Sequence, residues 1–103
     1  MQSALFETLE GAIRARKLIL CGYHGFPRVC CPHSIGRTHG VERLLAYQFA
    51  GDSSQGLATA GEWGCFDIRD MQSVTIFEGE WRTGPYQSRP KKCIESVYLD
   101  VST

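Results

Sequence analysis

Several polar and aromatic side chains of this chain have the chemistry needed to bind an anion. An arginine presents a planar fork of N–H donors that matches a carboxylate or a phosphate, and an aromatic ring offers a face for stacking. These side chains fall near the ends of predicted strands: Tyr23, Arg28, His33, Arg37, Tyr47, Trp63 and Arg69. They form the candidate ligand-binding set, and an ordinary salt-bridged surface with shielding aromatics is the alternative.

The cysteines and histidines do not form a pattern typical of catalysis or metal binding. Cys30 and Cys31 are neighbours on a predicted strand and point to opposite faces, so they cannot easily share one ion. The sequence has no CxxC or HxxxH spacing to complete a ligand set. A Cys–His nucleophile pair with His24 or His39 would need an orienting third group, which the sequence does not indicate. We therefore expect no enzyme, no metal and no other cofactor.

Cysteine number and the N-terminal sequence bear on the redox state. The five cysteines are Cys21, Cys30, Cys31, Cys65 and Cys93, which is an odd number. The first residues, MQSALFETLE, contain acidic residues and lack the basic segment of a secretory signal. We therefore expect reduced thiols, no structural disulfide and a cytoplasmic location. No apolar run approaches the roughly 20 residues of a membrane span, so we expect no membrane partner.

Composition is typical of an ordinary globular protein. The chain has 103 residues, 43% of them hydrophobic and 21% charged, which excludes a disordered class. The formal net charge is zero, but residues 1–50 carry six basic and three acidic side chains, which permits a positive patch. A committed nucleic-acid binder is usually more basic than this chain.

A helix is predicted before the first candidate residue. Leu5, Leu9, Ala12 and Ile13 lie on one stripe at helical spacing, and Ser3 can cap the N-terminus. A helix of about 13 residues is marginal alone. It is therefore expected to cover an apolar sheet.

Alternating and apolar runs predict the strands that position the candidate side chains. Strands are expected over 18–23, 28–31, 43–50, 63–69 and 73–77, with a last strand within 94–103 and loops over 34–42, 51–61 and 79–93. Pro32 is expected to end the second strand or to place it at a sheet edge. The first hairpin would then bring Tyr23 and Arg28 to one end of the sheet.

These elements predict one domain over residues 1–103. It would consist of a helical cap at 1–17, a barrel core at 18–78, a loop at 79–93 and a last strand at 94–103. The expected fold is mainly β (α+β): an N-terminal helix that caps a small antiparallel barrel of five to six strands, of SH3 or Sm-like type. A helix on an open antiparallel sheet is the alternative.

A particular order of residues runs through these strands. It comprises Ala12, Ile13, Leu20, Tyr23, Gly25, Arg28 and Pro32, then Leu44-Leu45-Ala46-Tyr47, then Trp63, Phe66 and Ile68 running into Met71 and Val74. Over residues 12–77 this order resembles the WYL domain, the Sm-like barrel found as a sensory module in bacterial transcription regulators. Glu42-Arg43-Leu44 stands where that family has its Trp-Tyr-Leu triad, and the charge order in Phe66–Met71 is altered. The chain looks like a divergent, free-standing relative with no preceding helix-turn-helix.

The resemblance implies binding rather than catalysis. It implies a small, non-catalytic, regulatory module that recognises an anionic small molecule or single-stranded nucleic acid, with Arg28 facing the ligand. The alternative is a structural or protein-interaction module that self-associates, or pairs with a partner, through a strand edge. Arg28 separates the two hypotheses, because a binding site needs it exposed beside aromatic rings and an interaction module would hold it in an ordinary surface ion pair.

Overall fold

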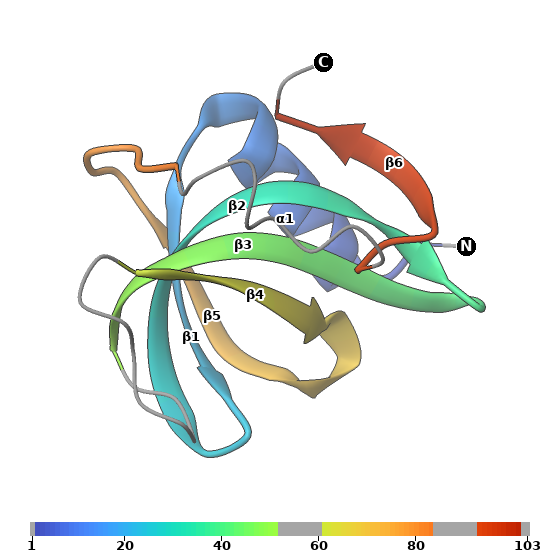
Figure 1. Ribbon diagram of the computed structural model, residues 1–103, viewed down its shortest axis with the longest axis horizontal. Helices are drawn as coiled ribbons and strands as arrows, with labels where there is room; N and C mark the ends of the chain where they lie inside the picture. Colours follow the sequence, from blue (N-terminus) through green and yellow to red (C-terminus); the bar gives the residue numbers. More distant parts are fainter. Residues whose placement is uncertain (1, 52–60, 84–92, 102–103) are drawn as a thin grey trace.

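The computed structural model describes residues 2–51, 61–83 and 93–101. Its elements are α1 (Ala4–Ala15), β1 (Leu18–Tyr23), β2 (Phe26–Thr38), β3 (Val41–Gly51), β4 (Glu62–Asp67), the 3-10 turn η1 (Ile68–Asp70), β5 (Met71–Phe77) and β6 (Ser96–Asp100) (Figure 1). The prediction of a mainly β chain with an N-terminal helix is confirmed. Most of the loops expected over 51–61 and 79–93 lie outside the described residues.

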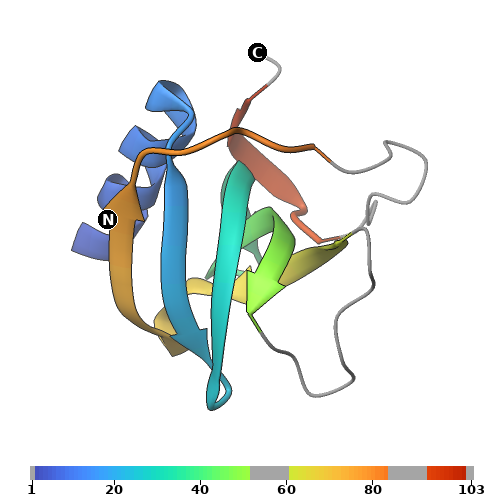
Figure 2. The same cartoon turned by 90° about the vertical axis from the view of Figure 1, so that its left-hand side faces the viewer.

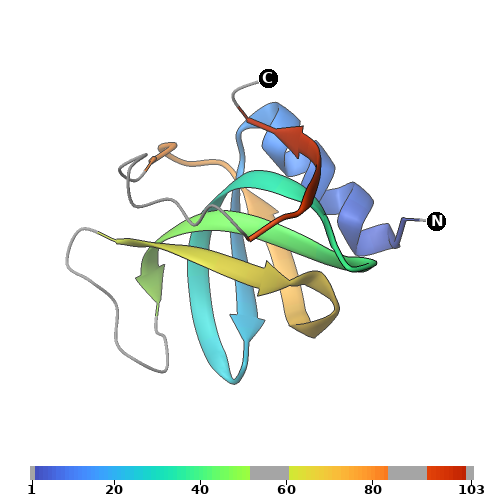
Figure 3. The same ribbon diagram turned by 45° about the vertical axis from the view of Figure 1, so that its right-hand side comes forward.

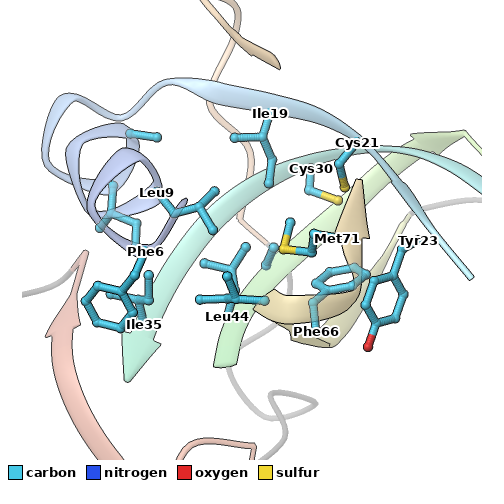
Figure 4. Packing of buried hydrophobic residues seen from close by; sticks show 14 residues of the cluster. Phe6, Leu9, Ile19, Cys21, Tyr23, Cys30, Ile35, Leu44, Phe66 and Met71 are labelled. Atoms are coloured by element: carbon cyan, nitrogen blue, oxygen red, sulfur yellow. The ribbon is translucent and has the colours of Figure 1, made fainter. Parts of the chain in front are cut away.

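Helix α1 forms where the sequence predicts it. The Ser3 hydroxyl accepts a hydrogen bond from the backbone N–H of Phe6 at 3.1 Å, and Arg16 ends the helix in the left-handed conformation at φ 52°. The helix buries Phe6, Leu9, Ala12 and Ile13. Phe6 and Leu9 point toward Ile35 of β2 and Leu44 of β3 (Figure 4). The helix therefore covers the inner face of the sheet.

The strands form one antiparallel sheet in the order β4-β3-β2-β1-β5, and β6 pairs with β2 outside this path. Strands β5, β1 and β2 lie side by side (Figure 2). The long β2 and β3 curve, and β6 lies beside the C-terminal half of β2 (Figure 3). Within the described strands no pairing joins β4 to β5, so the sheet is open. This is the architecture of the open-sheet alternative.

Strand β2 is longer than predicted, and the loop expected over 34–42 is wrong. The strand continues through Pro32 to Thr38 and turns at His39 and Gly40, which have φ values of 50° and 80°. The register shifts between Pro32 and Ser34, which leaves His33 as an extra residue. A bulge of this kind accommodates a proline inside a sheet. Pro32 therefore neither ends the strand nor lies at an exposed edge.

Gly36 allows β6 to cross close to β2. A Cβ atom at this position would collide with the carbonyl oxygen of Ser96 and with Cγ2 of Ile94. Its role is thus steric, and it does not mark a loop.

The main hydrophobic core lies between α1 and the inner face of the sheet and includes Phe6, Leu9, Ile19, Leu44 and Phe66 (Figure 4). A smaller cluster on the outer face contains Leu45, Cys93 and Ile94, with Trp63 packed against it. Because alternate residues of a strand face opposite sides of a sheet, Leu44 packs in the main core and Leu45 packs in the smaller outer cluster.

A disulfide joins Cys65 of β4 to Cys93 at the outer face. The expectation that all five cysteines are reduced and that no structural disulfide forms is wrong for this pair. The same expectation supported a cytoplasmic location, and that support falls away because stable disulfides are typical of oxidising compartments. Cys21, Cys30 and Cys31 are free and buried.

Burial affects how the free thiols titrate. Desolvation raises the pKa of Cys21, Cys30 and Cys31 above the ordinary value of 9.0, and the positive charge of Arg28 only partly opposes this at Cys21 and Cys30. A pKa that is higher in the folded state means that the unfolded chain releases its proton first. The contribution of each protonated thiol to the free energy of unfolding is fully present below the pKa of that thiol in the unfolded chain. It is lost as the pH rises through the pKa of the thiol in the folded protein.

We therefore expect the free energy of unfolding to fall with pH above the ordinary thiol value of 9.0. Cys30 should contribute a slope of about 1.4 kcal/mol per pH unit while only the unfolded chain is deprotonated. Denaturant unfolding of the oxidised protein at several pH values above and below 9.0 measures this slope. The Cys30→Ala variant should lose Cys30's share of the slope. Identical slopes for the two proteins would contradict the assignment.

Candidate ligand-binding site

The structure places the candidate residues in three separate locations. Tyr23 and Arg28 lie at the inner face, and Arg37 and Arg69 line a groove. His33, Tyr47 and Trp63 pack together at the outer face. The sequence places all seven near strand ends. It does not show which of them share a face of a curved sheet.

The outer-face aromatics pack against one another. Ring centroids are 4.9 Å apart for His33 and Trp63, 5.3 Å for Tyr47 and Trp63, and 4.8 Å for His33 and Trp81. His33 is 2% exposed and Tyr47 is 5% exposed. Their ring faces are therefore covered, and the cluster holds the segment around Trp81 on the sheet.

His33 is also fixed by hydrogen bonds. Its Nδ1 lies 2.7 Å from the carbonyl oxygen of Cys31, and its Nε2 lies 3.0 Å from the hydroxyl of Thr83. Because a carbonyl oxygen only accepts, Nδ1 must carry a hydrogen, and Nε2 can accept from Thr83. Because both ring nitrogens are hydrogen-bonded and the ring is buried, His33 has a structural role in packing the outer face.

Tyr23 lies at the edge of the inner core. Its hydroxyl accepts a hydrogen bond from the backbone N–H of Asp67 at 3.0 Å, and its ring meets Phe66 edge to face at 4.8 Å. The guanidinium carbon of Arg28 lies 5.3 Å from the Tyr23 ring centroid and 5.6 Å from that of Phe66. Arg28 is thus beside aromatic rings, and no ion pair involves it in the described part of the chain. Its side chain is partly buried, however, and not exposed as the binding hypothesis expects.

A groove of about 370 Å³ lies where the start of α1, the β2–β3 hairpin and η1 meet. Its lining residues are Gln2, Ser3, Arg37, Gly40, Val41, Glu42 and Arg69. This volume falls in the range of small-molecule sites. A second groove of about 220 Å³ lies between α1 and β6, and Arg28 lines neither of the two.

Glu42 organises one wall of the larger groove. Its carboxylate accepts hydrogen bonds from the backbone N–H of Ser3 at 2.9 Å and from the Ser3 hydroxyl at 2.6 Å. The Arg37 guanidinium lies 3.5 Å from the same carboxylate and over the Phe6 ring at 5.3 Å. Arg37 is therefore oriented by both the Glu42 carboxylate and the Phe6 ring.

Arg69 is the exposed cation of the groove. It lies on η1, and none of the described hydrogen bonds or ion pairs involves its side chain, so all five N–H donors are available. The two arginines and Glu42 give the lining a net charge of +1. The N-terminus of α1 adds roughly half a positive charge. The groove therefore favours an anion.

Some residues around these arginines were absent from the candidate set. Gln48 is buried beside Arg28, and Glu42 and Ser3 position Arg37. The alternation of β3 contains a usable signal for Gln48, because this polar residue shares a face with Leu44 and Ala46. No comparable signal links Ser3 to Glu42, since their contact depends on the tertiary fold.

Within residues 2–51, 61–83 and 93–101, no three His, Cys, Asp or Glu side chains gather in a way that could hold a metal ion. The same residues include no helix with the length and apolar character needed to cross a membrane. Comparison with protein-family models, curated proteins and solved structures finds no match to this chain.

Proposed function

We propose that this protein is a small non-catalytic binding module whose groove takes a small anionic molecule. The observation that carries the proposal is the exposed Arg69, which forms no ion pair with the described residues, in a net positive groove beside Arg37. Arginine donors match a carboxylate or a phosphate in geometry and charge. Gln2 and Ser3 add polar groups that can orient the rest of the ligand.

A small ligand is favoured over single-stranded nucleic acid. A nucleic-acid strand needs exposed aromatic faces on which bases stack, along a continuous basic path. The aromatic rings of His33, Tyr47 and Trp63 are instead packed against one another, and the net charge of the chain is zero. Nucleic acid thus remains an outcome of the test.

The regulatory role is part of the same proposal. The resemblance to the WYL domain motivates it. The N-terminal helix and the curved antiparallel sheet are features that such a domain would share, while the sheet itself is open between β4 and β5. A regulatory module of this kind would bind its ligand without converting it.

Substitution of Arg69 tests the groove. We expect wild type to bind inorganic phosphate or acetate, and Arg69→Gln to weaken that binding at least about tenfold, because a charge-assisted hydrogen bond is lost. Isothermal titration calorimetry at low ionic strength measures the affinities. Arg14→Gln is the matched control, since Arg14 is exposed on α1, forms an ion pair with Glu10 and lines the smaller groove instead of this one. The control should bind like wild type.

Equal affinity in wild type and Arg69→Gln would remove Arg69 from the site. Tighter binding of an oligonucleotide than of the small anions would favour nucleic acid. If neither binds, the self-association hypothesis gains support, because Val97 and Tyr98 on β6 are 55% and 51% exposed. Sedimentation velocity would then show a dimer that Val97→Ser disrupts.

A further inference from the structure

The Cys65–Cys93 disulfide is accessible from one of its two ends. Cys65 is an exposed residue of β4, whereas Cys93 is 5% exposed and packs with Leu45 and Ile94. A reductant can therefore approach Cys65 from water, and exposed disulfides are more labile than buried ones. The bond can thus be reduced in the folded protein.

The segment that starts at Cys93 is fastened to the β2–β3 hairpin, which forms one wall of the larger groove. The Thr38 hydroxyl donates to the carbonyl oxygen of Cys93 at 3.1 Å and accepts from the backbone N–H of Glu95 at 3.0 Å. Ser96 then pairs with Arg37 in the β2–β6 ladder. Because Arg37 lines the groove, the backbone that carries it is supported by this segment.

The Cys93 carbonyl group is also connected to the opposite wall of the groove. Arg43 donates through Nη1 to the Cys93 carbonyl oxygen at 3.3 Å and through Nε to Oδ1 of Asp67 at 2.9 Å. Asp67 directly precedes the 3-10 turn η1, on which Arg69 lies. Cys93 thus links the hairpin and η1, the two elements that bring Arg37 and Arg69 to one groove.

We propose that the disulfide is a redox switch for the groove: its reduction loosens both walls and weakens anion binding there. This regulation rests on the proposed function, since it acts on the same site. The element with two states is segment 93–95, which the disulfide keeps on the sheet and which can leave it more often once the bond is broken. Each time it leaves, the hydrogen bonds that Thr38 and Arg43 make to Cys93 are lost.

The redox step is a thiol–disulfide exchange with a dithiol reductant. One thiolate of the reductant attacks Sγ of Cys65, which forms a mixed disulfide and releases Cys93 as a thiolate. The second thiol of the reductant then attacks the reductant sulfur of the mixed disulfide and releases Cys65. Two electrons and two protons pass to the two cysteines, and the reductant leaves as a cyclic disulfide. An oxidised dithiol restores the bond by the reverse path.

Isothermal titration calorimetry of the full-length protein with inorganic phosphate tests the switch. We expect reduced wild type to bind about tenfold more weakly than oxidised wild type, which is a usual size for coupling between two sites. Cys65→Ser is the control, because it should bind like the reduced protein and should not respond to the reductant. Thr38→Val should weaken binding in the oxidised protein. Reduction of this variant should then add less than in wild type, because part of the connection is already missing.

A measurement without ligand separates this regulation from the proposed function. Backbone 15N relaxation should show added motion at Arg37, Gly40 and Arg69 in the reduced protein, and none at Ile19 in β1. Relaxation reports fast motion within the folded state, so the lower global stability of the reduced protein does not affect it.

Unchanged motion at the three groove residues, or equal phosphate affinity in the two redox states, would overturn the proposed switch. A different result would count against the proposed function alone: oxidised wild type that binds no phosphate, although reduction adds motion at the groove. The coupling between the disulfide and the groove walls would then still be demonstrated.

Discussion

Reduction of the Cys65–Cys93 disulfide is expected to lower the free energy of unfolding by about 3.5 kcal/mol. The cross-link joins residues separated by 28 positions, and it limits the conformations open to the unfolded chain. The folded state should survive at low temperature, because the Cys93 carbonyl oxygen also accepts hydrogen bonds from Thr38 at 3.1 Å and Arg43 at 3.3 Å. The disulfide thus stabilises the protein mainly by restricting the conformations of the unfolded chain.

Denaturant unfolding with and without a dithiol reductant measures this effect. The Cys65→Ser variant should match the reduced wild type in stability and should not respond to reductant. Intact mass should show two additional hydrogens in reduced wild type. A wild-type midpoint that reductant leaves unchanged, although the mass confirms reduction, would contradict the expected stabilisation.

Replacement of Phe6 by alanine is expected to cost about 3–5 kcal/mol of stability. The ring is fully buried, and it meets Tyr98 of β6 edge to face with centroids 5.5 Å apart. It also lies under the Arg37 guanidinium. Phe6→Ala should therefore leave a cavity between α1 and the sheet and loosen one wall of the groove.

Thr8→Ala provides the comparison, because Thr8 is exposed on the same helix. It should change the free energy of unfolding by at most about 0.5 kcal/mol. Urea unfolding of both variants tests the difference. A loss below about 1 kcal/mol for Phe6→Ala would mean that α1 does not form the cap described above.

The local pattern of the sequence is sufficient to predict the helix and the mainly β class. The apolar stripe and the Ser3 cap locate α1 to within a few residues, because both signals act within one or two turns. The course of β2 is not predictable in the same way. Pro32 and Gly36 are ordinary loop signals, and they are accommodated here by a bulge and by the close approach of β6.

The grouping of the candidate side chains depends on tertiary structure. Alternation predicts that Tyr47 and Gln48 face opposite sides of β3, but it does not say which side another segment covers. Arg37 and Arg69 line the same groove because the β2–β3 hairpin and η1 approach each other on the curved sheet. The disulfide has the same origin, since strand pairing brings β4 and the segment before β6 to one face.

The most direct test of the proposed function is a 1H–15N NMR titration of wild-type protein with inorganic phosphate, followed at backbone amides. Binding in the groove predicts saturable shifts at Ser3, Gly40 and Glu42, with the outer-face amides of Tyr47 and Trp63 unchanged. Shifts confined to the outer face, or no saturable shift at the groove amides, would contradict the proposal.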